Sequence, residues 1–369
     1  MKRSLAIVAL VLVSAAGLGL AGNYASSLYF AAGHGNACAS CHEMTANVSA
    51  IHGSPHHNAT CTDCHDSSIS TKLRHVADNA THRVPEQIHL READVRAMVP
   101  RCQSCHQHEY ASWHAGPHAA TYSEIFTNPA HNAKRRLMDD CFRCHGMYFQ
   151  GGIRDLVQQQ NAAGPWRLTR PELAAEPAIP CQSCHWIHRE GPGQGVHQAG
   201  SSNQTPPASQ PIADSLAFFD RREEQHFRAI SMTLPRLFNG PALLNASADP
   251  RQALCYQCHA PRQPETLTLA AQKHWGPQAG SGDDRTPTGV HEGLSCLACH
   301  NGHNESARAS CATCHSGTSR CGINVEKMDT TFAGASSGHN IHSVKCADCH
   351  QSGIPRPRSV SRTEPVRGQ

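Results

Sequence analysis

The sequence predicts a mostly α-helical and irregular fold that is organised around bound cofactors, with a single transmembrane helix at the N-terminus. Three observations predict it. Only 5% of the 369 residues are aromatic, too few large side chains to fill the two or three cores that this length suggests. The chain contains 19 Cys and 28 His, the residue types that hold metals and cofactors. An uncharged apolar segment lies near its start.

Residues 1–33 are predicted to form a membrane anchor or an export signal. Leu5 to Ala32 is a run of 28 uncharged residues, about 42 Å long as a helix, which is enough to cross a bilayer. Basic residues precede this run, and Tyr24 and Tyr29 would lie at the outer interface. Gly19-Leu20-Ala21 would suit signal cleavage, so a cleaved signal is the alternative to the uncleaved anchor that the length favours.

Eighteen of the 19 cysteines lie in nine copies of the pentapeptide Cys-x-x-Cys-His, numbered here in chain order. The cysteine pairs are Cys38/Cys41, Cys61/Cys64, Cys102/Cys105, Cys141/Cys144, Cys181/Cys184, Cys255/Cys258, Cys296/Cys299, Cys311/Cys314 and Cys346/Cys349. The motif histidines are His42, His65, His106, His145, His185, His259, His300, His315 and His350. Two thiols on one helical turn can form thioethers with a porphyrin, and the adjacent imidazole can ligate its iron. We therefore expect nine covalently bound c-type haems and a haem-dominated multihaem cytochrome c fold.

Two other kinds of site use paired cysteines. Zinc sites combine such pairs in twos and do not require a following histidine. A disulfide framework predicts neither the odd cysteine count nor the fixed histidine. The remaining thiol, Cys321, is interpreted as a lone buried cysteine, with a haem ligand or a redox-active group as the alternative.

The motifs divide the chain after the anchor into four parts. Residues 34–190 hold the first five motifs, and residues 251–350 hold the last four. Between them, residues 191–250 begin as a Gly/Pro/Ser/Gln-rich linker and continue with a predicted helix over Ile212–Ile230. The tail, residues 351–369, has the composition of a disordered segment. Two haem lobes are expected, with a single continuous haem-lined body as the alternative.

Nineteen of the 28 histidines lie outside the motifs, which favours a second imidazole on many of the irons and so low-potential electron-transfer haems. The candidate distal ligands chosen by their spacing from a motif are His57, His188, His291, His303, His339 and His342. The alternative for each is a surface histidine or a propionate partner; His34, His82, His89 and His108 are weaker candidates. Met44, two residues after His42, makes the first haem a candidate for methionine ligation or for five-coordination.

The formal charge of +3 omits the haems. Two propionates on each of nine haems would make the assembled protein acidic, so nucleic-acid binding is not expected. Covalent haem attachment takes place outside the bacterial cytoplasmic membrane. We therefore expect the chain in that membrane, with most of its mass in the periplasm.

The segment CASCHEM-TANVSAIH, after a single anchor and before ATCTDCH, resembles the amino-terminal part of the NapC/NirT family of membrane-anchored quinol-oxidising cytochromes. The resemblance covers about Leu5 to Val84. It implies that the first haem lies near the membrane with Met44 as its axial group, and that Lys72 is the quinol-site candidate. That family has four haems in a shorter chain, whereas five more follow here.

From Cys102 onward, CQSCHQHEYASWHAGPH resembles multihaem cytochromes related to hydroxylamine oxidation. In that group a Trp-x-x-Ser-x-His element follows the motif; here Trp113 and His118 stand in the matching places, with Gly116 where Ser is usual. The resemblance implies His118 as a distal ligand.

Two functions compete. The first is an electron conduit from the membrane quinol pool to a periplasmic or outer-membrane redox protein. The second is a terminal oxidoreductase acting on a small nitrogen or sulfur compound, which needs an iron with an open position. Every motif ends in His, so the Lys-for-His variant of ammonia-forming nitrite reductases is absent. Haem storage or a structural role is a third alternative. The sequence favours the conduit.

Overall fold

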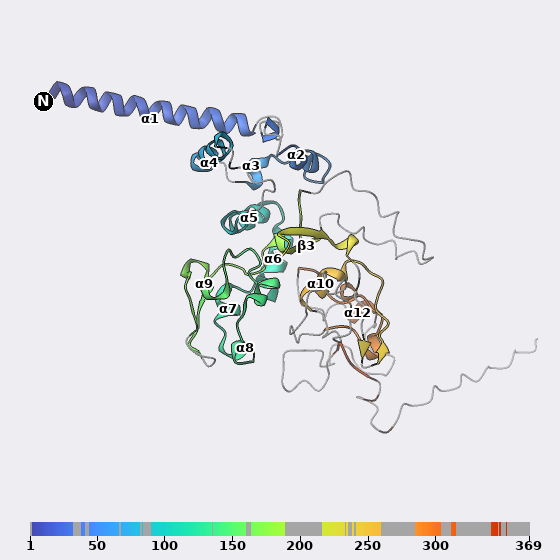
Figure 1. Ribbon diagram of the computed structural model, residues 1–369. Helices are drawn as coiled ribbons and strands as arrows, with labels where there is room; N and C mark the ends of the chain where they lie inside the picture. The colour runs from blue at the N-terminus through green and yellow to red at the C-terminus, as the bar shows by residue number, and fades with distance from the viewer. Residues whose placement is uncertain are drawn as a thin grey trace, which may run out of the picture. The chain divides into compact units, whose positions relative to one another are not determined.

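The computed structural model describes residues 2–31, 38–40, 44–65, 68–81, 83, 90–134, 136–159, 164–188, 216–232, 234, 238–239, 241–259, 285–303, 311–314, 341–345, 347 and 352. Of these residues, 54% are helical, and the strands among them form three two-stranded sheets (Figure 1). The chain is therefore partly helical, with short elements joined by irregular segments.

The α-helices are α1 (Lys2–Ala31), α2 (Thr45–His52), α3 (Cys61–Cys64), α4 (Ile69–Ala80), α5 (Glu92–Cys105), α6 (Gln107–His114), α7 (Tyr122–Phe126), α8 (Pro129–Lys134), α9 (Ile153–Leu156), α10 (Gln252–Cys258) and α12 (Cys311–Cys314). The 3-10 helices are η2 (Cys38–Ser40), η4 (Pro117–Ala119), η5 (Asp139–Arg143), η6 (Pro171–Leu173), η7 (Cys181–Ser183), η8 (Ala229–Ser231), η9 (Gly289–His291) and η10 (Cys296–Ala298). The antiparallel strand pairs are β1 (Val157–Gln158) with β2 (Arg167–Leu168), β3 (Ala217–Asp220) with β4 (Gln225–Arg228), and β5 (Phe238–Asn239) with β6 (Ala242–Leu243).

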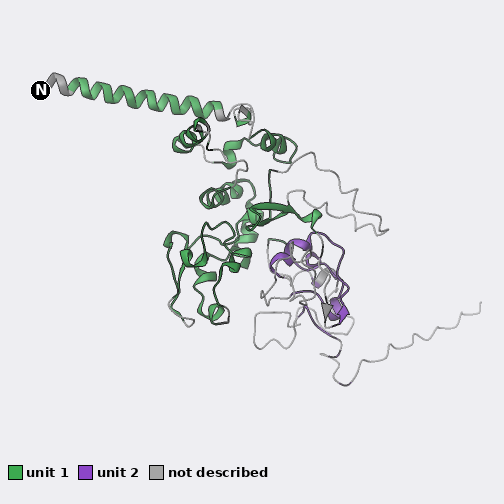
Figure 2. Ribbon diagram, in the orientation of Figure 1, with its two compact units in different colours: residues 1–233, 301–306 green, residues 234–300, 307–369 purple. Residues whose placement is uncertain are grey.

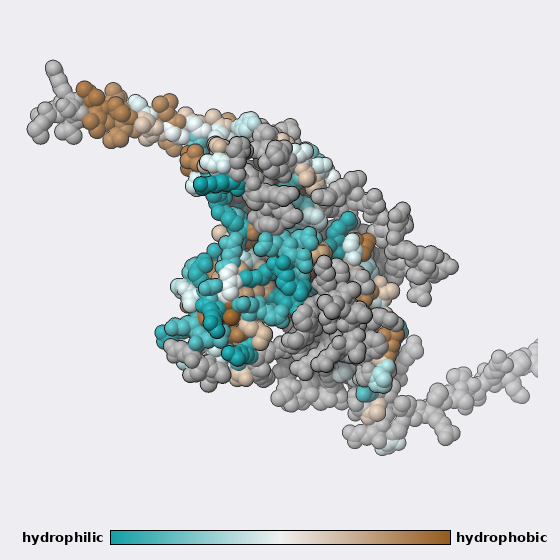
Figure 3. Space-filling model, viewed as in Figure 1, coloured by the Kyte–Doolittle hydropathy of each residue, from teal (hydrophilic) through white to brown (hydrophobic). Residues whose placement is uncertain are grey.

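Helix α1 contains the one segment in the described part of the chain that is long and apolar enough to cross a membrane. This segment, Ala6–Tyr29, has a mean hydropathy of 2.0, and none of its most apolar stretch is buried against the protein. Figure 3 shows the hydrophobic surface concentrated over the N-terminal half of α1. An N-terminal membrane segment was predicted from composition, and the helix fits it; a signal sequence has the same properties.

The chain forms two compact units (Figure 2). Unit 1 consists of Met1–Thr233 together with Asn301–Ser306, and it contains the first five motifs. Unit 2 consists of Leu234–His300 and Ala307–Gln369, and it contains the last four. A short stretch that follows the seventh motif thus belongs to unit 1.

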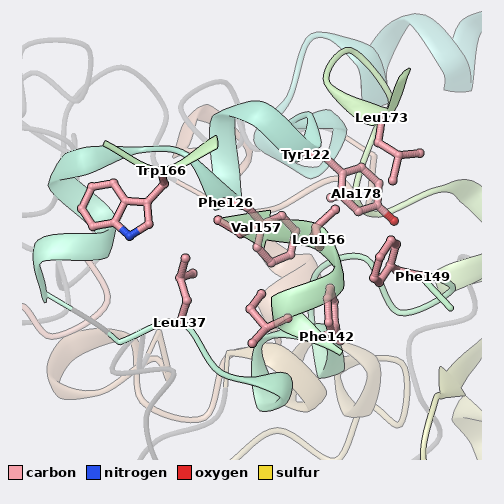
Figure 4. Packing of buried hydrophobic residues seen from close by; sticks show 11 residues of the cluster. Tyr122, Phe126, Leu137, Phe142, Phe149, Leu156, Val157, Trp166, Leu173 and Ala178 are labelled. Atoms are coloured by element: carbon pink, nitrogen blue, oxygen red, sulfur yellow. The ribbon is translucent and has the colours of Figure 1, made fainter. Parts of the chain in front are cut away.

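Unit 1 contains a side-chain core around the fourth motif (Figure 4). Phe126, Phe142 and Leu156 are fully buried in it, and Cys141 packs against it. The Phe142 ring lies 5.6 Å from that of Phe126 and 5.3 Å from that of Phe149, measured between centroids. The other members are Tyr122, Leu137, Ile153, Val157, Trp166, Leu173 and Ala178. Aromatic side chains, which are scarce in this chain, are thus concentrated around one motif.

The helix predicted over Ile212–Ile230 is wrong for its described residues, which form the β3–β4 hairpin. The charged residues 221–224 form the tight turn between the two strands, where Glu224 has a φ of 52°. The hairpin docks on the fifth motif, because the Ala217 N–H donates to the Cys184 carbonyl at 3.0 Å. The linker and tail predictions lie outside the described residues, apart from Ser352.

Candidate haem sites

The second to seventh motifs, all of which the structure describes in full, share one local fold. In each, the N–H of the motif histidine donates to the carbonyl of the first motif cysteine, at 2.8 to 3.1 Å. The bonds are His65 to Cys61, His106 to Cys102, His145 to Cys141, His185 to Cys181, His259 to Cys255 and His300 to Cys296. This turn places the two cysteines on one side, as attachment to a single porphyrin requires.

In three motifs the second cysteine directly follows the 3-10 helix that contains the first. Cys144, Cys184 and Cys299 are the C-cap residues of the 3-10 helices η5, η7 and η10, and each closes a turn with the first cysteine of its motif. An extended residue precedes each of these short helices, so no earlier helical turn continues into the motif. The N–H of each cysteine still donates to the carbonyl of the first motif cysteine, at 3.1 to 3.3 Å.

These cysteines form no disulfide in the described part of the chain. Cys144 is half-buried beside the core of unit 1, and Cys299 is exposed in unit 2. Both were predicted to bind haem covalently, and that attachment stays a prediction. A haem at either motif would join one cysteine within a 3-10 turn to one that directly follows it.

Short polar contacts hold the motif turns where they have little helix to support them. In the four-residue helix α3, the Thr60 N–H donates to Asp63 Oδ2 at 2.7 Å, which caps the second motif. In the seventh motif, Ser295 Oγ accepts from the Leu297 N–H at 3.2 Å and donates to Asp249 Oδ2 at 2.9 Å. The Thr, Ser and Asp residues beside the motifs therefore have a local structural role.

Four motif histidines each face a histidine from outside the motifs. The ring centroids of His65 and His188 are 5.8 Å apart, and those of His56 and His106 are 5.9 Å apart. His185 faces His303 at 6.0 Å, with their planes 10° apart. In unit 2, His300 faces His342 at 5.9 Å, with their planes 5° apart.

These separations fit two imidazoles on opposite sides of one iron. Two metal–nitrogen bonds of about 2 Å, plus about 1 Å from each nitrogen to its ring centre, add up to about 6 Å. Aromatic rings in direct contact span a similar range, so the distance alone does not identify a metal site. The stronger observation is the choice of partners: each of the four pairs joins one motif histidine to one other histidine.

The described residues do not gather in the arrangements that the two alternatives require. No three His, Cys, Asp or Glu side chains converge there as a protein-only metal site would need. The cysteines that the structure describes form no disulfides. A pair of imidazoles is by contrast enough for a porphyrin iron, because the macrocycle supplies the other four nitrogens.

The His65–His188 pair shows how an imidazole is prepared for such a role. His188 Nδ1 lies 3.3 Å from the Asn47 carbonyl, which can only accept, so Nδ1 carries the proton and Nε2 keeps its lone pair. Burial, followed by the neighbouring His188, lowers the pKa of His65 to about 4. Burial also lowers the pKa of His188. Both rings are therefore neutral at pH 7, the form that binds metals.

Thiol contacts show which motifs adjoin. A hydrogen bond with Cys38 lowers the pKa of Cys61 to about 6, so the first and second motifs meet at their leading cysteines.

The third and fifth motifs meet in the same way, because a hydrogen bond with Cys181 raises the pKa of Cys102. In unit 2 a hydrogen bond with Cys255 raises the pKa of Cys296, which joins the sixth and seventh motifs. The haems predicted at these motifs would therefore be close neighbours.

Three predicted distal ligands, His188, His303 and His342, face motif histidines. His56 does so as well, although the sequence analysis selected its neighbour His57. His57 Nδ1 donates to the Ser54 carbonyl at 3.1 Å, which leaves a lone pair on Nε2, so its assignment as a ligand stays a prediction. The doublet His56-His57 was the available signal, but spacing could not choose between its members.

The other predicted ligands stay predictions. His291 Nδ1 donates to the Ile341 carbonyl at 3.2 Å, so its Nε2 keeps a lone pair. His118 is exposed on η4, and Met44 immediately precedes α2. Cys41, His42, His315, Cys321, His339, Cys346, Cys349 and His350 lie outside the described residues, as do the weaker candidates His34, His82 and His89.

Lys72, the quinol-site candidate, lies on α4 beside the membrane helix. Its Nζ donates to Ser27 Oγ of α1 at 2.9 Å. Ser27 is 21 residues beyond Ala6, about 31 Å along the helix, which corresponds to one hydrocarbon thickness of about 30 Å. The ammonium group is therefore placed where a membrane-spanning α1 would leave the outer side of the bilayer.

No family model matches this sequence, and neither the curated proteins nor the solved structures gave a match. What this chain does therefore has to be inferred from its motif turns, its imidazole pairs and α1.

Proposed function

We propose that this chain is a membrane-anchored nonahaem c-type cytochrome that carries electrons from membrane quinol to a periplasmic or outer-membrane redox protein. The observation that carries the proposal is the set of four imidazole pairs, each made of one motif histidine and one other histidine. The apolar segment Ala6–Tyr29 of α1 and the repeated motif turn support it.

The residues of this chain would divide the work as follows. The paired cysteines would hold each haem covalently, and at four of the motifs the imidazole pairs would supply ligands to its iron. When bound, a haem supplies a one-electron redox couple. Two imidazoles leave an iron no open position, so the four paired sites suit electron transfer better than substrate reduction. This favours the conduit over a terminal oxidoreductase acting on a small nitrogen or sulfur compound.

The entry point for electrons is proposed at the outer end of α1. Lys72 is held against Ser27 there, and its ammonium can donate a hydrogen bond to a quinol oxygen. The resemblance of this region to the NapC/NirT family supports the same assignment. The hydrogen bond between Cys38 and Cys61 supports a step from the first motif to the second.

The test is a count of haems and of their spin states in the purified protein. The mature mass should include nine covalent haems, and electron paramagnetic resonance should show low-spin, bis-imidazole iron at every site except the one nearest the membrane. A second high-spin haem would favour the terminal oxidoreductase, and a mass without haem would end the proposal.

A pair of variants makes this test specific. His303→Ala should convert one low-spin signal to high spin, because it removes the imidazole that faces His185. His131→Ala, which changes an exposed histidine on α8, is the matched control and should leave the spectrum unchanged. Equal spectra for the two variants would contradict the assignment of His303.

A further inference from the structure

Helix α4 exposes two large apolar side chains. Ile69 is 50% exposed and Leu73 is 63% exposed. Four residues separate them, so they lie on the same side of the helix, one turn apart. An exposed pair of this kind requires an explanation on a short helix that is rich in polar residues.

The contact between Lys72 and Ser27 ties α4 to α1 at the level of the outer membrane boundary. Figure 1 shows α4 beside the C-terminal part of α1. Leu73 directly follows the lysine in the sequence, and Ile69 precedes it by three residues, which is less than one helical turn. The apolar pair is therefore held within a few ångströms of the same depth.

The exposed apolar surface of α1 continues through this level. Tyr24 is 68% exposed, Leu28 is 54% exposed and Tyr29 is 57% exposed. These residues reach the place where aromatic side chains favour the interface between lipid and water. Two elements of the same unit thus expose apolar side chains at one depth, which favours a lipid surface over a protein partner.

The charges of α4 fit the same occupant. Lys72 and Arg74 flank Leu73, whereas the helix carries a single carboxylate, Asp78, near its end. A short helix with apolar side chains on one side and cations beside them is typical of segments that lie in a membrane interface, where the cations meet lipid phosphates.

We propose that α4 lies in the outer membrane interface, with Ile69 and Leu73 inserted among phospholipid chains. The proposal rests on the membrane-anchored function above and deepens it. Lipid contact by α4 would fix the depth of Lys72, and thereby hold the quinol candidate where the ring of a lipid-soluble quinol can reach it.

A light-activated crosslinking residue, p-benzoylphenylalanine, tests this in the full-length, haem-loaded protein. It would be placed singly at Leu73, at Ile69 or at His75, and the protein reconstituted in vesicles of phosphatidylethanolamine and phosphatidylglycerol. His75 is exposed nearly opposite Leu73, and Arg91 and Asp94 act on it electrostatically from the start of α5. Mass spectrometry after illumination should show about tenfold more lipid adduct at Leu73 and Ile69 than at His75.

A fourth probe position, Leu12 in α1, separates the two proposals. Lipid adducts at Leu12, with none at Leu73 or Ile69, would overturn the interfacial α4 and leave the anchor in place. An absence of adducts at Leu12 as well would overturn the membrane-anchored function. Crosslinks from Leu73 and Ile69 to protein rather than lipid would also overturn the proposal, because they would identify a protein as the occupant.

Discussion

Residues 121–178 of unit 1 and the described part of unit 2 hold their motifs in different ways. The first region buries a cluster of large side chains against the fourth motif. In the second, the one cluster of this kind among the described residues consists of Tyr256 with Leu244 and Ala246 packed on it. The comparison shows how unevenly a small supply of aromatic residues is distributed along this chain.

The difference bears on what stabilises each region. A cluster with several fully buried aromatic and aliphatic side chains contributes its own hydrophobic free energy. The described part of unit 2 relies on polar contacts such as the ion pair of Arg251 with Asp249, 2.7 Å long, which contribute little on their own. A haem at the sixth or seventh motif would therefore add more to the stability of the described part of unit 2 than a haem at the fourth motif would add to residues 121–178.

The largest effect is expected when the two cysteines that would hold one haem are replaced in each region. In the double variant Cys255→Ser/Cys258→Ser, we expect the described part of unit 2 to unfold and to be cleaved rapidly by protease. The matching double variant is Cys141→Ser/Cys144→Ser. Its residues 121–178 should be cleaved at least about tenfold more slowly than the described part of unit 2 in the first variant, because their side-chain core remains. Limited proteolysis with mass spectrometry measures both. Equal cleavage rates for the two regions in these variants would contradict the difference in stability proposed between them.

A smaller effect is expected from the core itself. Phe126→Ala removes a fully buried ring and should lower the free energy of unfolding of unit 1 by about 3–5 kcal/mol. Leu243→Ala is the control in unit 2; its side chain is 54% exposed, and its effect should stay within about 0.5 kcal/mol. Chemical denaturation followed by far-ultraviolet circular dichroism measures both. A loss below about 1 kcal/mol for Phe126→Ala would contradict a stabilising role for this side-chain core. It would indicate that haem supports this region, as it would in unit 2.

The smallest effect concerns the β3–β4 hairpin. The Tyr148 hydroxyl donates to the Gln182 carbonyl at 2.9 Å, and its ring stacks on Phe219 with centroids 4.2 Å apart. Tyr148→Phe keeps the stacking and loses one hydrogen bond, so a loss of about 1 kcal/mol is expected. The Gln182 carbonyl still has His226 Nε2 at 3.0 Å. Faster hydrogen exchange confined to the hairpin and the fifth motif would support this, whereas exchange unchanged throughout would show that the bond is not needed.

The parts that the sequence predicted are those set by local rules. The motif turns follow from the Cys-x-x-Cys-His spacing, and α1 follows from 28 uncharged residues. Spacing did not show that the turns at Cys141 and Cys296 are 3-10 turns without a preceding helix, because the extended residue ahead of each turn decides that. The β3–β4 hairpin could not be predicted in this way either, because its strands are short and it docks on the Cys184 carbonyl, far away in the sequence.

The same limit applies to the imidazole pairs. Spacing nominated His188, His303 and His342, but it could not say which motif each would face, since the partners come from distant segments. Nor could it choose His56 over His57, because adjacent residues differ only in the direction of their side chains. Such choices depend on tertiary packing rather than on local sequence.

The placement of His303 affects the order in which this protein can be assembled. Asn301–Ser306 belongs to unit 1, although the chain on both sides of it belongs to unit 2. As the polypeptide emerges from its N-terminal end, His185 is made long before the imidazole that faces it. His185 therefore has no facing imidazole until residue 303 has been synthesised, and a chain terminated after the fifth motif would lack one.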